Sequence, residues 1–94
     1  MTVLLELTLR ENTDDALSIV RETLDQTAAF DGNEAVEVLV DDDNPLKLVV
    51  VETWVTTAHH ATYDAWRQTP EGASRLGTIT EFRRKRIFSS TIPL

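Results

Sequence analysis

The chain has 94 residues, a formal net charge of -7 and no cysteine. This length suits one domain with one modest core, spanning residues 1–94. The lack of cysteine excludes disulfides, thiolate nucleophiles and cysteine-based zinc sites. The negative charge argues against nucleic acid or an anionic membrane as a partner. No basic leader or bilayer-length apolar run is present, so we expect a cytoplasmic protein.

The first third of the sequence predicts a strand followed by a helix. Residues 2–10 alternate imperfectly between apolar and polar side chains, which indicates a strand. Asn12 or Thr13 can cap a helix that ends before the turn-forming residues 31–33. Apolar side chains then repeat at helical spacing and predict the buried stripe of this helix. These side chains are Ala16, Leu17, Val20, Leu24 and Ala28.

The rest of the chain predicts three strands and one helix. Residues 34–40 alternate, and an acidic turn at residues 41–45 joins them to an apolar segment at 46–55, which reads as a hairpin. The acidic turn lacks the spaced ligands of a calcium loop. A helix is expected from about Thr57 to Gln68, where Thr69-Pro70 stops it. A mixed segment at residues 71–81, a last strand at 82–90 and a short tail follow.

The strand predicted at residues 46–55 is apolar on both faces. Leu48 and Val50 lie on one face, with Val49, Val51 and Val55 on the other. Two helices cover only one face of a small sheet, so a second copy of the chain is the expected cover of the other face. The order of elements predicts an α+β fold of the ferredoxin-like βαββαβ type with an antiparallel sheet, assembled as a homodimer.

The basic run at residues 83–86 has two interpretations. It could bind nucleic acid, but an extended strand would divide its side chains between two faces. A solvated or ion-paired strand is therefore favoured.

The helix predicted at residues 57–68 has no ordinary aliphatic stripe. Between Ala58 and Gln68 it contains no Leu, Ile, Val, Met or Phe. We expect its alanines, Ala58, Ala61 and Ala65, to approach the sheet closely. The larger side chains would then line a pocket between this helix and the sheet of the same subunit. These side chains are His59, His60, Tyr63, Trp66 and Arg67.

Each of these residues also has a purely structural interpretation. Tyr63 and Trp66 suit a core as well as a pocket wall, and a lone histidine is more often a hydrogen-bonded residue than a base. Adjacent histidines diverge by about 100° on a helix, so His59 and His60 do not form a metal pair. Arg67 suits an ion pair with Asp64 or Glu71.

Two residues of the neighbouring strand also have more than one interpretation. Glu52 lies in an apolar strand, which favours an ion pair with Arg84 or Arg86, with proton transfer as the second interpretation. Trp54 suits the core or the dimer interface.

Several of these features together resemble the antibiotic biosynthesis monooxygenase family, which includes the quinol monooxygenases. They are the order of elements, the Asp43-Asn44-Pro45 turn, the strand end Glu52-Thr53-Trp54, the spacing of His60, Tyr63 and Trp66-Arg67, and Gly72. The resemblance implies a dimeric α/β barrel in which two sheets pack face to face. Several family members oxidise phenols or quinols with molecular oxygen and use no metal, flavin or haem.

The resemblance suggests a site on the second helix. An electron-rich phenolate can itself reduce oxygen if the protein stabilises the anion, orients the ring and excludes water. His60 and Trp66 are the expected catalytic residues, and Tyr63, Arg67, His59 and Glu52 the expected substrate-binding residues. The expected substrate is a quinol or a polyketide-like aromatic, with O₂ as co-substrate and no cofactor.

Two other functions remain open. A non-catalytic dimer that binds a small molecule or acts as a stress accessory competes with the monooxygenase. Haem degradation ranks lower, because relatives with that activity resemble one another in a histidine beyond the tryptophan and an asparagine on the first strand. This chain has no histidine after His60 and no asparagine in residues 3–10.

Overall fold

The computed structural model describes all residues from 1 to 94 and confirms the predicted βαββαβ order. The only addition is a short helix, α3, in the segment expected to be mixed. The elements are β1 (Thr2–Leu9), α1 (Ala16–Ala29), β2 (Asn33–Val40), β3 (Lys47–Trp54), α2 (Thr57–Arg67), α3 (Leu76–Ile79) and β4 (Thr80–Phe88).

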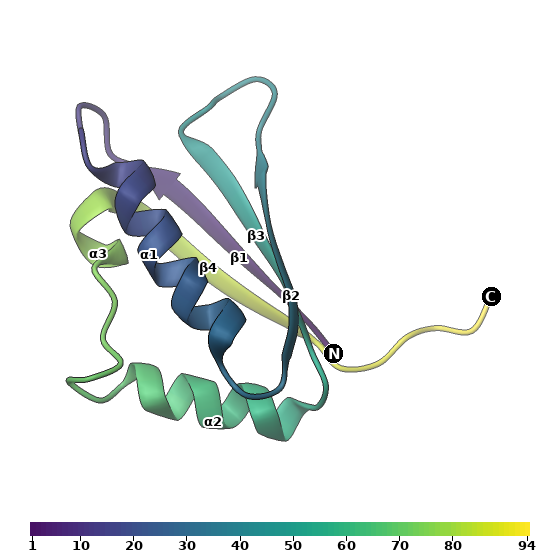
Figure 1. Ribbon diagram of the computed structural model, residues 1–94. Coiled ribbons are helices and arrows are strands. Elements are labelled where there is room, and N and C mark those ends of the chain that lie inside the picture. The colour runs from purple at the N-terminus through teal and green to yellow at the C-terminus, as the bar shows by residue number, and fades with distance from the viewer.

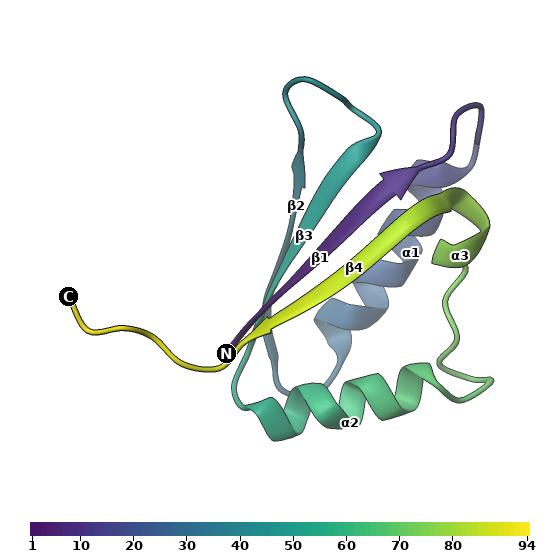
Figure 2. The ribbon, with the colours of Figure 1, turned by 180° about the vertical axis from the view of Figure 1, so that it is seen from behind.

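The four strands form one antiparallel sheet in the order β2-β3-β1-β4. All three helices lie on one side of this sheet, and the opposite side is bare when the molecule is turned around (Figures 1 and 2). We call these the helix face and the open face. No helix is both long and apolar enough to span a membrane.

β3 is apolar on both faces, as the sequence predicted. Its helix-face residues Leu48, Val50 and Trp54 are buried, whereas Val49 and Val51 lie half-buried on the open face. Other strands add large apolar side chains to the open face, as their register with β1 and β3 shows. Those that are clearly exposed are Leu39, Phe82 and Phe88.

The buried face of α1 matches the predicted stripe in part, since Ala16 and Val20 are buried and Leu24 is half-buried. Ile19, Thr23 and Thr27 are buried, whereas Leu17 is 62% exposed and Ala28 is also exposed. The two threonines fit the core because each hydroxyl donates to the carbonyl one turn back, at 2.8 and 3.1 Å. The predicted stripe was therefore correct for three of its residues and wrong for Leu17 and Ala28.

The orientation of α2 is also a correction. Ala58, Ala61 and Ala65 are exposed, while His60 and Tyr63 are buried against the sheet. Large rings remove far more apolar surface from water than alanine methyl groups do, at about 25 cal/mol per Å². The aromatic side of α2 consequently packs on Val3 and Trp54 rather than standing away from the sheet.

β4 contains one irregularity that fixes which of its side chains face the helices. Leu9 pairs with Thr80 and Thr8 with Phe82, so Glu81 is an extra residue in β4, a β-bulge. Beyond it, Arg83 and Lys85 pair with Leu7 and Leu5 on the helix face. Arg84 and Arg86 alternate with them onto the open face, which confirms the predicted division of the basic run.

Candidate functional site

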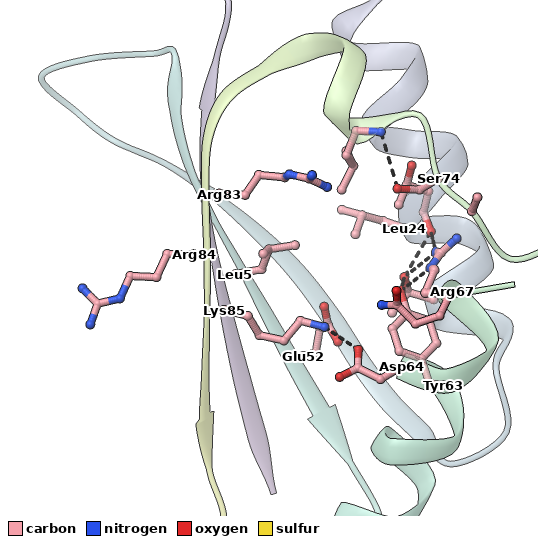
Figure 3. Close-up of a pocket in the computed structure, with 15 residues that line it drawn as sticks. Leu5, Leu24, Glu52, Tyr63, Asp64, Arg67, Ser74, Arg83, Arg84 and Lys85 are labelled. Atoms are coloured by element: carbon pink, nitrogen blue, oxygen red, sulfur yellow. Dashed lines mark hydrogen bonds and ion pairs between the residues drawn. The ribbon is translucent and has the colours of Figure 1, made fainter.

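A cavity of about 710 Å³ lies on the helix face, enclosed by α1, α2, the segment before α3, and the sheet. This volume falls within the range of small-molecule sites, about 300–1,000 Å³. Leu5, Leu24 and Leu76 provide an apolar floor and side. Charged residues from β3, β4 and α2 complete the lining (Figure 3). These are Glu52, Asp64, Arg67, Arg83, Arg84 and Lys85.

Arg67 joins α2 to α1 at the mouth of the cavity. Its Nε donates to the Tyr63 hydroxyl at 2.7 Å, and Nη2 donates to the Thr23 carbonyl at 2.9 Å. Nη1 donates to Gln26 Oε1 and to the Gly72 carbonyl. The expected ion pair with Asp64 or Glu71 is absent, because the guanidinium turns toward α1 instead. All of its hydrogen-bond partners are neutral, so its positive charge is not compensated there.

Tyr63 is buried beneath this guanidinium. Its hydroxyl lies 2.8 Å from Thr27 Oγ1 and accepts from Arg67 Nε. The Arg67 guanidinium carbon also lies 5.1 Å from the centre of the Tyr63 ring. The phenol is thereby held in one orientation at the cavity wall.

Glu52 is a buried carboxyl group in the wall of the cavity, only 2% exposed. Trp54 Nε1 donates to its Oε1 at 3.0 Å. Burial raises the pKa of Glu52, while the Trp54 hydrogen bond and the charges of Lys85 and Arg67 offset part of that rise. The carboxyl group is thus a stronger base than an exposed glutamate.

The predicted ion pair of Glu52 with Arg84 or Arg86 is wrong. Glu52 shares the helix face with Val3, its partner in the β1 register, whereas Arg84 and Arg86 lie on the open face. Figure 3 shows the Arg84 side chain directed away from the cavity. The strand period of two residues places Lys85 on the Glu52 side instead.

Asp64 and Lys85 form an ion pair inside the cavity that the sequence did not reveal. Lys85 Nζ donates to Asp64 Oδ1 at 2.6 Å, which bridges β4 and α2 (Figure 3). The partners are 21 positions apart, so neither helix nor strand spacing relates them. The only signal in the sequence was the alternation of the basic run, which puts Lys85 on the face of Leu5.

His60 lies behind the cavity wall and does not line it. The ring is 3% exposed, with its centre 5.4 Å from that of Trp54. Its Nε2 is buried without a hydrogen-bond partner and lies 3.9 Å from Asp64 Oδ1. Burial lowers the pKa of His60, and Lys85 lowers it further, whereas Asp64 acts in the opposite direction. His60 is therefore a neutral imidazole at neutral pH.

His59 and Trp66 also lie outside the cavity lining. His59 Nδ1 is 2.7 Å from Thr56 Oγ1 at the start of α2, and its ring packs against Gly32, where any Cβ would overlap it. Trp66 packs against Phe30 and stacks under the Arg67 guanidinium at 4.8 Å. Of the predicted site residues, the structure thus brings together Tyr63, Arg67 and Glu52 around the cavity and places His60 immediately behind it.

The polar side chains of the site are carboxyl groups, basic groups and a tyrosine hydroxyl, and they are not arranged as metal ligands. No group of three or more His, Asp or Glu side chains is arranged to hold a metal ion. The arrangement suits binding of a polar aromatic molecule, with one buried carboxyl group able to exchange a proton with it.

Known proteins share this fold across its whole length. SnoaB, described as a cofactor-independent oxygenase from Streptomyces nogalater, superposes with a TM-score of 0.81 at 16% identity, covering 99% of this chain and 94% of that one. A conserved protein from Methanosarcina mazei Go1 gives 0.78 at 14% identity, with 96% and 91% covered. A protein described as an antibiotic biosynthesis monooxygenase gives 0.77 at 18% identity, with 97% and 98% covered.

The sequence itself carries the family assignment. No curated protein matches the chain closely enough to transfer an activity. The model of the antibiotic biosynthesis monooxygenase family, however, matches residues 2–73. That span contains β1 through α2 and the Tyr63–Arg67 network of the cavity. The chain belongs to the antibiotic biosynthesis monooxygenase family.

Proposed function

We propose that this protein is a cofactor-independent monooxygenase that oxidises a quinol or polyketide-like aromatic with molecular oxygen. Family membership supports this reaction class, as does the likeness in fold to a protein described as a cofactor-independent oxygenase. The cavity supplies a small-molecule site of suitable size, lined by the Tyr63 side chain, three leucines and several charged residues.

The observation that carries the proposal is the buried Glu52 carboxyl group in the cavity wall. Its raised pKa brings its basicity closer to that of a phenol, which favours proton transfer from a bound hydroxyl. Only Oε1 is occupied, by the Trp54 indole, so the other carboxyl oxygen is available to a ligand. In this proposal the proton acceptor is Glu52 and not His60, which the resemblance had implied as a catalytic residue.

The cations near Glu52 stabilise the phenolate that deprotonation creates. Arg67 and Lys85 both line the cavity, and both favour the anionic form of a bound phenol. The phenolate supplies the electrons for oxygen reduction. One oxygen atom replaces a ring hydrogen and the other leaves as water, while the quinol itself is oxidised to a hydroxyquinone, which accounts for the four electrons that O₂ takes up. The leucines keep bulk water away from the reacting carbon.

His60 and Trp66 act by positioning in this proposal. His60 packs against Trp54, whose indole orients Glu52, and its Nε2 lies beside Asp64. Trp66 supports the Arg67 guanidinium from below. His59 belongs to the start of α2 and holds it near the Gly32 turn.

The assembly proposed for this enzyme is a homodimer joined through the open face. Phe82 and Leu39 are 51% and 48% exposed there, next to half-buried Val49 and Val51. Such a contiguous apolar sheet surface is costly in water, and the same surface on a second copy is a self-complementary cover.

Oxygen consumption with 1,4-dihydroxynaphthalene tests the function. We expect the protein to consume oxygen above the rate of autoxidation, and Glu52→Gln to lose about 10²-fold to 10⁴-fold of that excess. Glu11→Gln, which removes an exposed carboxylate in the loop before α1, is the matched control. If the quinol binds but no oxygen is consumed, the protein is a small-molecule binder and the proposal fails.

A further inference from the structure

The cavity carries an excess of positive charge in a protein whose net charge is -7. Four basic residues border it, but Arg84 directs its side chain away, so that Arg67, Arg83 and Lys85 contribute three cations to the cavity. Asp64 neutralises Lys85 through their ion pair at 2.6 Å. Even with Glu52 ionised, one positive charge remains uncompensated, and with Glu52 protonated two remain.

The guanidinium of Arg83 has no interaction partner within the protein. It makes no hydrogen bond or ion pair, unlike Arg75, whose guanidinium pairs with Glu22 at 2.8 Å. Figure 3 shows the Arg83 side chain leaving β4 on the cavity side and extending toward the segment before α3. Gly77 of α3 lies next to its Nη2 and leaves that approach open.

Arg83 and Glu52 mark opposite ends of the site. Arg83 pairs with Leu7 and Glu52 with Val3 in the β1 register. Four strand residues separate these positions, or about 13 Å at roughly 3.3 Å per residue. A ligand that reaches both ends must therefore be elongated, with a proton to give at one end and a group that pairs with a guanidinium at the other.

We infer that the aromatic substrate carries a carboxylate, which Arg83 binds at the α3 end of the cavity while the ring hydroxyl lies at Glu52. A guanidinium offers paired donors that match a carboxylate, whereas a neutral quinol leaves it unpartnered. The inference rests on the proposed function for the oxidation of the ring, but the binding preference itself needs no turnover.

Anaerobic calorimetry with two probes of the same shape tests the inference. 6-Hydroxy-2-naphthoate places a hydroxyl and a carboxylate at opposite ends of a rigid ring system, and 6-hydroxy-2-naphthamide replaces only the charge. We expect the carboxylate to bind about tenfold more tightly than the amide to the wild-type protein. Arg83→Gln should reduce this preference to within about twofold.

Arg21→Gln is the matched control, since it removes one exposed arginine from the outer side of α1 without touching the cavity. It should keep the tenfold preference. The inference is overturned if the amide binds the wild type as tightly as the acid, if the preference survives in Arg83→Gln, or if neither probe binds at about 1 mM. Carboxylate-selective binding without oxygen consumption on any quinol would remove the proposed function and leave this inference intact.

Discussion

Lys85 of β4 and Asp64 of α2 meet at 2.6 Å, and this pair sets the electrostatic environment of two buried residues on opposite sides of it. Glu52 and His60 both respond to these two charges, yet neither forms an ion pair of its own at hydrogen-bonding distance. Both partners are about one-third exposed, so the pair itself contributes little stability, about 0.2–1 kcal/mol. Its larger effect is on proton affinities.

The first prediction is that the two partners shift the pKa of His60 in opposite directions. Lys85→Gln removes a charge that lowers it, so the His60 pKa should rise, whereas Asp64→Asn removes a charge that raises it, so the pKa should fall. NMR titration of the His60 imidazole measures both shifts. Lys47→Gln, at an exposed position of β3, should leave the resonance unmoved. Shifts of the same sign in both variants would show that the geometry is wrong.

The second prediction concerns the dependence of stability on pH. The folded pKa of Glu52 is raised, so the folded state binds more protons than the unfolded state above pH 4.5, and stability falls as pH rises through the folded pKa. Glu52→Gln should remove this decline. The folded pKa of His60 is lowered, so its contribution is present above pH 6.5 and is lost as pH falls. Urea unfolding of the wild type and of Glu52→Gln, measured between pH 4.5 and pH 6.5 and again at neutral pH, checks how the free energy of unfolding depends on pH.

The third prediction is that the Tyr63 hydroxyl stabilises the junction of α1 and α2. Tyr63→Phe leaves the Thr27 hydroxyl and the Arg67 Nε without their shared partner, at a cost of about 1–3 kcal/mol in the free energy of unfolding. A double-mutant cycle with Thr27→Val should give a coupling of about 0.5–3 kcal/mol. Additive effects would mean that the hydroxyl contact contributes nothing specific.

The fourth prediction is that the open face holds two copies of the chain together. Val51→Asp places a charge at the centre of that face and should give monomeric, aggregated or unfolded protein, because an isolated subunit exposes the patch. Leu17→Asp, at an exposed position on the helix side, should remain dimeric. Light scattering at micromolar concentration decides this, and a wild-type mass of one chain, 10.6 kDa, would contradict it.

The sequence was sufficient for the order of elements because local periodicity determines strands and helices. The alternation in β2 and β3 and the Pro70 stop after α2 placed these elements within a residue or two of the observed bounds. Part of the buried side of α1 was missed because the hydroxyls of Thr23 and Thr27 form their hydrogen bonds within the helix, which a hydrophobicity pattern does not reveal. Face assignment needed the rotation of each helix against the sheet, which is a tertiary property.

The candidate site was only partly predictable for the same reason. Tyr63 and Arg67 stood out as large polar groups on a helix without aliphatic residues, and the structure places both at the cavity. In the sequence, Lys85 was only one of the four basic residues at 83–86. That it forms its ion pair with Asp64 and not with Glu52 depends on the distance between α2 and β4, which the sequence does not give. The resemblance and the helical pattern together ranked His60 above Glu52, since neither carries information about which buried group borders the cavity.

The bulge at Glu81 determines which residues of β4 lie on the helix face of the sheet and which lie on the open face. Because side chains alternate along β4, the register that this extra residue sets sends Arg83 and Lys85 to the cavity and Phe82 and Phe88 to the open face. Regular pairing from Thr80 opposite Leu9, without the bulge, would exchange the two sets and would place Phe82 on the helix face and Arg83 and Lys85 on the open face. The lining of the cavity and the composition of the open face therefore both depend on the same nine residues of β4, and a change of register alters the two together.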